Sequence, residues 1–490
     1  MKNKYILISL FVGLAMAGCG NERTVSQYPL TPPSIEDETQ DLRSALTGTH
    51  IVGEKPAETT VLTLQTQINT SNTTIVTVPV QTTIKTTAVT TAETTAKATG
   101  HIVSTENATQ PPTAPVTQSP QTQPVQPETQ VPTSQPEQLR HDLRNYSNVN
   151  EMTANMSLEE KVSQMFIVTP EQLGSESTSA GESARSTLST YAVGGVVFFD
   201  DNLQSVQQVQ TLISSLNDYS RESIGAGLFT AVKEESGSLS YVSSKLGTVS
   251  FYDMAVYGES GDSETAKSIG STVGGELRNC GFNLDFAPVA DSRLNSENSM
   301  GNRLFSSSPD VTASMTAGFT EGIQSAGVSA TLKYFPGLSY AKVNNYNWEF
   351  EVIDRTIDQL RSEEFVPFKS GISAGADFVM VGHQIVTGFG DGLPSDLSYS
   401  VITSTLRNEL GFTGIVITDA HNTGAMKSTY GVNSAVMAVK AGADMILMPD
   451  NLGDAVNAIC GAVNSGEVPV SRIDESVSRI LLKKQKLGLI

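Results

Sequence analysis

Gly411-Phe-Thr-Gly-Ile-Val-Ile-Thr-Asp-Ala-His-Asn-Thr-Gly-Ala-Met426 is the stretch that decides the fold. Its centre, 415–417, is a short run of β-branched apolar residues between glycines, which is typical of a strand buried on both faces. The run ends at Thr418 and Asp419. Parallel sheets keep their chemistry at the carboxyl ends of the strands, so Asp419 is a candidate catalytic residue. An acid after a strand also often caps the next helix, and position alone does not separate the two interpretations.

Seven further apolar runs have the same character, and segments with helical periodicity lie between them. The eight predicted strands are 164–168, 194–199, 227–232, 283–290, 329–335, 378–383, 414–418 and 443–448. Examples of the predicted helices are 266–277, 358–371 and 401–410. Eight strand–helix alternations predict an α/β fold, a (β/α)8 barrel of the TIM type, with its site at the strand carboxyl ends. Those ends carry Lys233, Glu234, Glu235, Asp291, Lys333, Tyr334, Phe335, His383, Asp419 and Asp450.

The first residues predict export and a lipid anchor. Two lysines precede an apolar run at 5–14, which is too short for an ordinary spanning helix and has the basic front of a secretory signal. The ending Ala17-Gly18-Cys19 resembles a bacterial lipobox, which implies removal of residues 1–18 and a lipid on Cys19. An ordinary signal peptide with a chance cysteine is the alternative. We therefore expect an extracytoplasmic protein, anchored by lipid to the bacterial cell membrane.

Residues 19–144 have the composition of a disordered linker. They are rich in Thr, Ser, Pro and Gln and contain almost no aromatic residues, so burial cannot offset the entropy lost on ordering. As a flexible coil this stalk would reach roughly 60 Å on average. Such a length suits a globular part, 145–490, that works at a distance from the membrane, for example within a cell wall. A spacer with no wall role fits the same composition.

The composition also limits the partners and cofactors. The chain carries 31 Lys and Arg against 51 Asp and Glu, a net charge of −20, which argues against nucleic acid as a partner. Cys280 and Cys460 lie in apolar, helix-like contexts, and we interpret both as buried thiols. No group of His, Cys and Asp has metal-ligand spacing, so we expect no metal and no other cofactor.

A series of motifs runs in a fixed order through the globular part. They are Leu158-Glu-Glu-Lys-Val-Ser-Gln-Met165, Val193-Gly-Gly-Val-Val-Phe-Phe199, Gly281-Phe-Asn-Leu-Asp-Phe-Ala-Pro-Val-Ala-Asp291, Gly301-Asn-Arg-Leu-Phe305, Lys333-Tyr-Phe-Pro-Gly337, Leu406-Arg-Asn-Glu-Leu-Gly-Phe-Thr-Gly-Ile-Val-Ile-Thr-Asp419 and Ile473-Asp-Glu-Ser-Val-Ser-Arg-Ile-Leu-Leu482. Together they resemble the barrel domain of glycoside hydrolase family 3, and most of all its single-domain bacterial β-N-acetylhexosaminidases. The resemblance implies hydrolysis of β-glycosides with retention, through a covalent intermediate on Asp419. A carboxylate suits that role because it is anionic at neutral pH and attacks an oxocarbenium-like centre.

The resemblance also implies residues that bind a carbohydrate. Arg303 matches an arginine that donates hydrogen bonds to the sugar, and Lys333 matches the lysine of a Lys-His-Phe-Pro-Gly motif in which Tyr334 replaces the histidine. The family's Asp-x-Glu-Gly-Gly motif matches Lys233-Glu-Glu-Ser-Gly237. Its aspartate accepts hydrogen bonds from sugar hydroxyls, so Lys233 at this position reverses the charge and removes an acceptor.

The largest departure from the family lies in the loop after Gly337. The family's general acid/base is an Asp/His pair in this loop, and Asn344 and Tyr346 stand at those two positions. Asparagine carries no charge, and a tyrosine that titrates near pH ~10 is a poor proton donor at neutral pH. The missing acid/base step is worth about 10² to 10⁴ in rate. Candidates for a substitute acid are Glu349, Glu351 and His421.

Two functions therefore stay open from the sequence. The first is a surface-anchored glycosidase that acts on β-linked N-acetylhexosaminides, such as cell-wall fragments. The second is a degenerate barrel that keeps the fold and sugar binding and serves as a wall-binding or scaffolding lipoprotein. The family resemblance favours the first, while the catalytic loop and Lys233 favour the second.

The anchor prediction is tested by Cys19→Ala, which removes the thiol that the lipid would occupy. We expect this variant to leave the membrane fraction or to accumulate as an unprocessed precursor, as judged by fractionation and immunoblotting. Ser26→Ala in the linker is the matched control and should stay with the membrane. Unchanged membrane association of the Cys19→Ala protein would contradict the anchor.

Overall fold

The computed structural model describes residues 141–341 and 348–490. The predicted signal peptide and the lipidation site Cys19 lie outside the described residues, as do Asn344 and Tyr346 in the catalytic loop. So does the predicted linker, apart from its last residues. The first described element is the 3₁₀ helix η1 (Leu143–Asn145), whose Leu143 is already fully buried.

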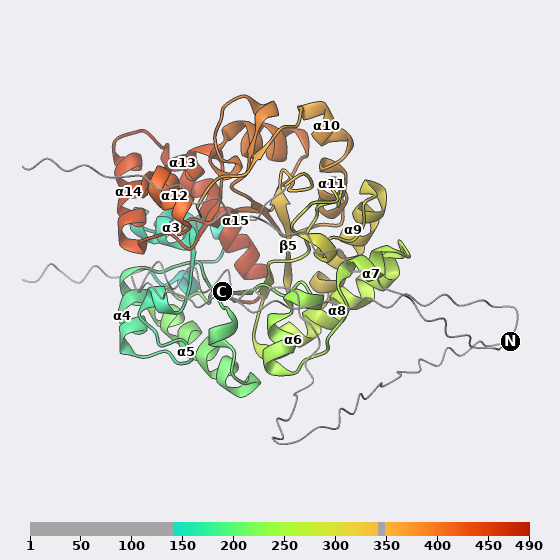
Figure 1. Cartoon of the computed structure of the whole chain (residues 1–490). Coiled ribbons are helices and arrows are strands. Elements are labelled where there is room, and N and C mark those ends of the chain that lie inside the picture. The colour runs from blue at the N-terminus through green and yellow to red at the C-terminus, as the bar shows by residue number, and fades with distance from the viewer. Residues whose placement is uncertain (1–140, 342–347) are drawn as a thin grey trace, which may run out of the picture. The chain divides into compact units, whose positions relative to one another are not determined.

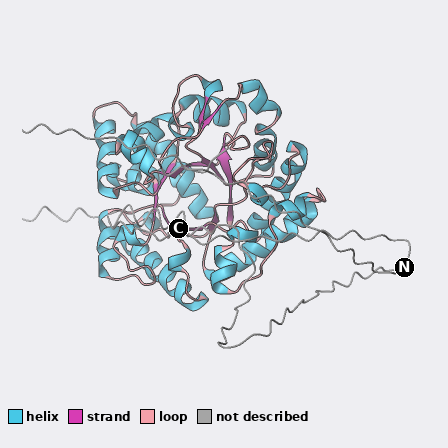
Figure 2. Cartoon of the chain, viewed as in Figure 1, coloured by secondary structure: helices cyan, strands magenta, loops and turns pink. Residues whose placement is uncertain are grey.

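Eight parallel strands close into a barrel, which confirms the predicted fold class. They are β1 (Phe166–Val168), β2 (Gly195–Val197), β3 (Phe229–Val232), β4 (Leu284–Asp285), β5 (Ser329–Phe335), β7 (Phe378–Val381), β9 (Ile415–Ala420) and β10 (Met445–Leu447). Their order around the barrel is β1-β10-β9-β7-β5-β4-β3-β2. Each overlaps one of the eight predicted strands, because a strand buried on both faces leaves a continuous apolar run in the sequence. Figure 2 shows the strands at the centre of a ring of helices.

The helices cover the outside of the barrel (Figure 1). They are α2 (Val149–Asn155), α3 (Leu158–Gln164), α4 (Glu182–Thr190), α5 (Val206–Ile224), α6 (Tyr241–Leu246), α7 (Met254–Gly258), α8 (Ser263–Cys280), α9 (Pro309–Ser325), α10 (Ile357–Ser362), α11 (Phe365–Ser373), α12 (Gly424–Thr429), α13 (Asn433–Ala441), α14 (Leu452–Asn464) and α15 (Val470–Lys486). Across 141–341 and 348–490, none of them has the length and apolar character that a membrane span needs.

Short elements complete the connections. They are the 3₁₀ helices η2 (Glu171–Leu173), η3 (Asp200–Asn202), η4 (Gly237–Leu239), η5 (Gly301–Arg303), η6 (Thr387–Phe389) and η7 (Ser395–Leu397), the π-helix η8 (Ser400–Glu409), and a two-stranded sheet of β6 (Val352–Ile353) and β8 (Ile385–Val386). Cys280 and Cys460 are free and buried, as predicted.

Two of the predicted helices differ in detail. The predicted helix 358–371 is broken into α10 and α11. In a continuous helix the ring of Pro367 would clash with the carbonyl of Glu363, four residues earlier. Arg355 forms ion pairs with both Glu363 and Glu364 at this break. The predicted helix 401–410 is the π-helix η8, in which the hydroxyl of Thr405 donates to the carbonyl of Ser400, five residues earlier.

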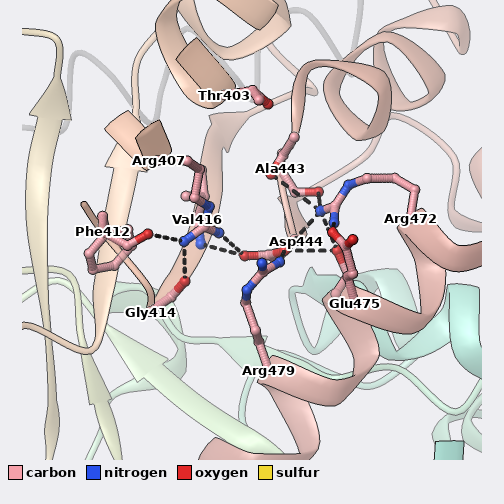
Figure 3. A network of polar contacts seen from close by, with 12 residues as sticks. Thr403, Arg407, Phe412, Gly414, Val416, Ala443, Asp444, Arg472, Glu475 and Arg479 are labelled. Carbon is pink, nitrogen blue, oxygen red and sulfur yellow. Dashed lines mark hydrogen bonds and ion pairs between the residues drawn. The ribbon is translucent and has the colours of Figure 1, made fainter. Parts of the chain in front are cut away.

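A buried carboxylate joins several elements at the amino-terminal end of the barrel (Figure 3). Asp444 directly precedes β10 and is fully buried. It pairs with Arg407 of η8 and, at 2.9 Å each, with Arg472 and Arg479 of α15, and it accepts a hydrogen bond from the backbone of Val416 in β9. Burial raises the pKa of Asp444, but the three arginine charges outweigh burial and hold this pKa below its usual value.

Asp444→Asn should therefore destabilise the barrel. Asparagine keeps the shape but leaves three partly buried guanidinium groups without a counter-charge, and breaking a buried ionic network in this way costs about 3–5 kcal/mol. Urea denaturation of the full chain measures the change, with the exposed Asp218→Asn as the matched control. A loss within about 0.5 kcal/mol, the usual range for a surface substitution, would contradict the structural role of Asp444.

Candidate active site

A cavity of about 200 Å³ lies at the carboxyl ends of the strands. Its lining residues come from the ends of the barrel strands and the loops that follow them: Phe199, Lys233, Phe286, Met300, Arg303, Lys333, Tyr334, Leu338, Met380, Gly382, His383, Gln384, Asp419, Ala420, Asn422, Thr423, Leu447 and Met448. All five described residues that the sequence assigned to the site, Asp419, Arg303, Lys333, Tyr334 and Lys233, line this one cavity.

Asp419 is held by the sheet itself. Strand β9 runs to Ala420, two residues beyond the predicted end, and Ala420 is in register with Leu447 of β10. One carboxylate oxygen of Asp419 accepts a hydrogen bond from the backbone of Ala420 at 2.8 Å. The next helix, α12, has Thr423 as its N-cap. The capping interpretation of Asp419 is therefore wrong.

Glu235 forms ion pairs with two cationic side chains that line the cavity. Its buried carboxylate accepts hydrogen bonds from Nε and Nη2 of Arg303 at 2.8 and 2.9 Å. It also forms an ion pair with Lys333. Burial raises the pKa of Glu235, but the charges of Arg303 and Lys333 outweigh burial and hold this pKa far below its usual value. Burial lowers the pKa of Lys333 to about 8, against the attraction of Glu235. Three separate segments of the chain thus meet at one carboxylate.

The sequence places Glu235 at a strand end but assigns it no role. The signal was present, because Glu235 occupies the glutamate position of the matched Asp-x-Glu-Gly-Gly motif. Tyr334, which replaces the motif histidine, places its hydroxyl 3.5 Å from Nη2 of Arg303. Burial raises the pKa of Tyr334 well above its usual value, so its hydroxyl stays protonated at neutral pH.

Lys233 differs from the other cations of the cavity. It is half-buried at the end of β3 and borders the cavity. Its positive charge acts on Glu235, whose pKa it helps to lower together with Arg303 and Lys333.

A buried Asp–His pair stands directly behind the candidate nucleophile. Asp396 of η7 is fully buried, and its Oδ2 lies 3.0 Å from Nδ1 of His383. Nε2 of His383 lies 2.9 Å from the carbonyl oxygen of Ala420, next to Asp419. Both acceptors need a proton from the ring, so the geometry calls for the imidazolium form of His383. Burial alone would lower the pKa of His383, but the charge and hydrogen bond of Asp396 outweigh it and raise this pKa to about 9.

His421 does not face the cavity. It is buried, with Nε2 at 2.9 Å from Oδ2 of Asp396 and Nδ1 at 3.0 Å from the hydroxyl of Ser434. Burial lowers the pKa of His421, against the pull of Asp396. The proposed role of His421 as a substitute acid is therefore not supported by its placement. Of the other two candidates, neither Glu349 nor Glu351 lines the cavity.

The loop that leads toward Asn344 and Tyr346 is fixed by Asp291. Its carboxylate accepts hydrogen bonds from the backbone of Leu338 at 2.7 Å and from the hydroxyl of Ser339 at 3.2 Å. Burial raises the pKa of Asp291 to about 7. Within the described part of the chain, no three His, Cys, Asp or Glu side chains are grouped so that they could hold a metal ion.

Comparisons with known proteins agree with this architecture. The family model for the "Glycosyl hydrolase family 3 N terminal domain" matches residues 157–482. A "Beta-hexosaminidase" of Stenotrophomonas maltophilia (strain K279a) is 33% identical over 300 residues, which cover 59% of this chain and 86% of the relative. "Beta-hexosaminidase A" of Pseudoalteromonas piscicida is 26% identical over 327 residues, which cover 61% of this chain but only 54% of the relative.

Among solved structures, a glycoside hydrolase family 3 β-N-acetylglucosaminidase from Paenibacillus sp. str. FPU-7 superposes with a TM-score of 0.65 and 32% identity. The match covers 68% of this chain and 63% of that one. A β-N-acetylhexosaminidase from Beutenbergia cavernae DSM 12333, at 25% identity and a TM-score of 0.60, is covered to 99% of its length. The chain thus spans about half of the Pseudoalteromonas relative and almost the whole of the Beutenbergia structure.

The His383–Asp396 pair predicts a pH dependence of stability. The folded pKa of His383 is about 9 and the unfolded value is about 6.5. Because the folded pKa is the higher one, protonated His383 stabilises the folded protein fully below pH ~6.5. This contribution to the free energy of unfolding, roughly 3 kcal/mol, is lost as the pH rises through ~9.

The measurement is the free energy of unfolding in urea at pH 6 and pH 9.5. The wild-type protein should lose roughly 3 kcal/mol more over this interval than His383→Gln. His141→Gln, which changes a half-exposed histidine outside the cavity, should behave like wild type. Equal losses in the wild type and His383→Gln would show that His383 is neutral in the folded protein.

Proposed function

The chain belongs to glycoside hydrolase family 3, and on that premise we propose that it cleaves β-N-acetylhexosaminides with Asp419 as the nucleophile. The observation that carries the proposal is the position of Asp419 at the end of β9, where its carboxylate borders the cavity together with Arg303 and Lys333. The names of the hexosaminidase relatives support the choice of sugar.

The chemistry follows from a carboxylate that faces a bound sugar. An oxygen of Asp419 attacks the anomeric carbon, the glycosidic C–O bond breaks, and the leaving oxygen takes the electron pair and a proton. Water then attacks the anomeric carbon of the glycosyl ester, which releases the sugar with its configuration retained and frees Asp419. The second group of a retaining pair stands about 5–5.5 Å from the nucleophile. This second group gives its proton to the leaving oxygen and takes a proton back from the attacking water. Asn344 and Tyr346 stand at its positions in this chain, and neither suits the role at neutral pH, so hydrolysis of an unactivated sugar would need a substitute.

Arg303 and Lys333 would orient the sugar. The bidentate pair with Glu235 uses Nε and Nη2 of Arg303, and the second terminal nitrogen of the guanidinium is free of that contact. A guanidinium has five N–H donors in a fixed fork, so donors remain for sugar hydroxyls. Glu235 would act here as a positioning residue, because it holds both cations without reaching the sugar itself.

A second candidate function is sugar binding without efficient hydrolysis. It is favoured by Asn344 and Tyr346, neither of which supplies an acid suited to neutral pH. A barrel of this kind would serve as a carbohydrate-binding or scaffolding protein. For either function we propose that the lipid-anchored Cys19 and the linker 19–144 place the barrel outside the cytoplasm at the membrane, within reach of the cell wall.

The two candidates differ in how a leaving group departs. A dinitrophenolate leaves without protonation, whereas a sugar alkoxide does not. If Asp419 is the nucleophile, dinitrophenyl β-N-acetylglucosaminide should give a burst of about one equivalent of phenolate, followed by slower turnover. Stopped-flow absorbance measures the burst, and Asp419→Ala should abolish it. Asp450→Ala, which removes an exposed carboxylate at the end of β10, is the matched control and should keep it.

Hydrolysis of a natural disaccharide separates the outcomes. Cleavage at a rate typical of glycosidases would establish the hydrolase and would require a substitute acid. A burst without disaccharide cleavage would favour the second candidate. An absent burst, or a burst that survives in Asp419→Ala, would refute the role of Asp419.

A further inference from the structure

We propose that the cavity is built for a negatively charged sugar, with Lys233 as the residue that binds its anionic group. The group would be a carboxylate or a sulfate carried by the sugar that Asp419 faces. This inference rests on the proposed function and refines it, because it names the class of glycoside.

The first argument is the balance of charge in the cavity. Four cationic side chains border it, Lys233, Arg303, Lys333 and the imidazolium of His383, and Asp419 is the carboxylate that borders it with them. The charge of His383 is balanced by its buried partner Asp396. Glu235 lies behind the wall and is shared between Arg303 and Lys333. The charge of Lys233 also acts on Glu235, so these three cations face the two carboxylates of Glu235 and Asp419. This count leaves one positive charge in excess at the cavity, although the chain as a whole carries a net charge of −20.

The second argument is the position of Lys233. In a folded protein a partly buried ammonium usually gains a carboxylate or several hydrogen-bond acceptors, because desolvation without a partner costs free energy. Within the described ranges Lys233 acts on Glu235 only through its charge, while the neighbouring Lys333 is in a direct ion pair with Glu235. The segment 342–347 reads Lys-Val-Asn-Asn-Tyr-Asn and contains no acidic residue. An anionic ligand is the partner that fits this cation.

The third argument concerns what the cavity would do with a neutral sugar. Lysine donates hydrogen bonds and accepts none. A hydroxyl at Lys233 would act only as an acceptor, with the ammonium charge left uncompensated. A carboxylate or sulfate meets the ammonium as a charge-assisted hydrogen bond, which is about twice as strong as a neutral one. Neutral and charged sugars should thus differ clearly in affinity.

Calorimetry on the full chain tests the inference with four sugars. N-acetylglucosamine is the neutral reference, N-acetylmuramic acid and glucuronic acid carry a carboxylate, and N-acetylglucosamine 6-sulfate carries a sulfate. At least one anionic sugar should bind about tenfold to a hundredfold more tightly than the neutral one, as expected for a hydrogen bond to a charged group. Comparison of the carboxylates with the sulfate identifies which anion the site takes.

Variants at Lys233 assign the preference to this residue. Lys233→Met should bring the anionic and neutral sugars to within about threefold of each other, and Lys233→Arg should keep the preference, because it retains the charge. Lys369→Met removes an exposed lysine of α11 outside the cavity and is the matched control. Circular dichroism verifies that each variant is folded.

The outcomes separate this inference from the proposed function. If N-acetylglucosamine binds as tightly as every anionic sugar, or if the preference survives Lys233→Met, the anionic site is refuted. A protein that releases dinitrophenolate from the neutral glycoside and shows no anionic preference would keep the proposed function and lose the inference. A protein that binds none of the four sugars but gives the Asp419-dependent burst would also keep the proposed function and lose the inference. A protein that shows neither binding nor a burst would lose both.

Discussion

Closure of the sheet is the constraint on which the rest of the structure depends. All eight strands are parallel, so their carboxyl ends open on one rim and their amino ends on the other. Residues that are far apart in the sequence, such as Lys233, Lys333 and Asp419, therefore line one cavity. At the amino-terminal end, Asp444 and its arginines connect η8, β9 and α15 and keep that end closed. Stability and chemistry are thereby assigned to opposite ends of the barrel.

Two buried carboxylates shape the catalytic end in different ways. Glu235 holds Arg303 and Lys333 in place and leaves donors free for a ligand. Asp396 keeps His383 positively charged, and His383 in turn donates to the carbonyl of Ala420, the residue next to Asp419. Each carboxylate acts through a cation rather than through the ligand. Such support is what holds a site in a productive geometry, because the groups that reach the ligand are themselves fixed by buried partners.

The sequence was sufficient to predict the barrel and the charged residues that line the cavity. Buried parallel strands leave apolar runs that are easy to recognise, and ordered motifs identified Asp419, Arg303 and Lys333. The sequence could not reveal the pairing of Asp396 with His383, because η7 and the end of β7 meet only in the folded chain and no spacing rule connects them. Neither could it show that His421 turns away from the cavity, since the side chain of the residue after a strand can face either way. The break at Glu363 and Glu364 was not predicted, because the apolar periodicity continues across it.

The central claim is that Asp419 attacks the anomeric carbon of a bound sugar. Mass spectrometry tests it most directly, after incubation of the full chain with a 5-fluoro N-acetylglucosaminyl fluoride, an activated sugar whose covalent adduct forms faster than it hydrolyses. The account predicts that one glycosyl unit is added, that it is found on the peptide containing Asp419, and that Asp419→Asn prevents its addition. A label on any other residue, or an unlabelled protein that still binds the sugar, would contradict the account.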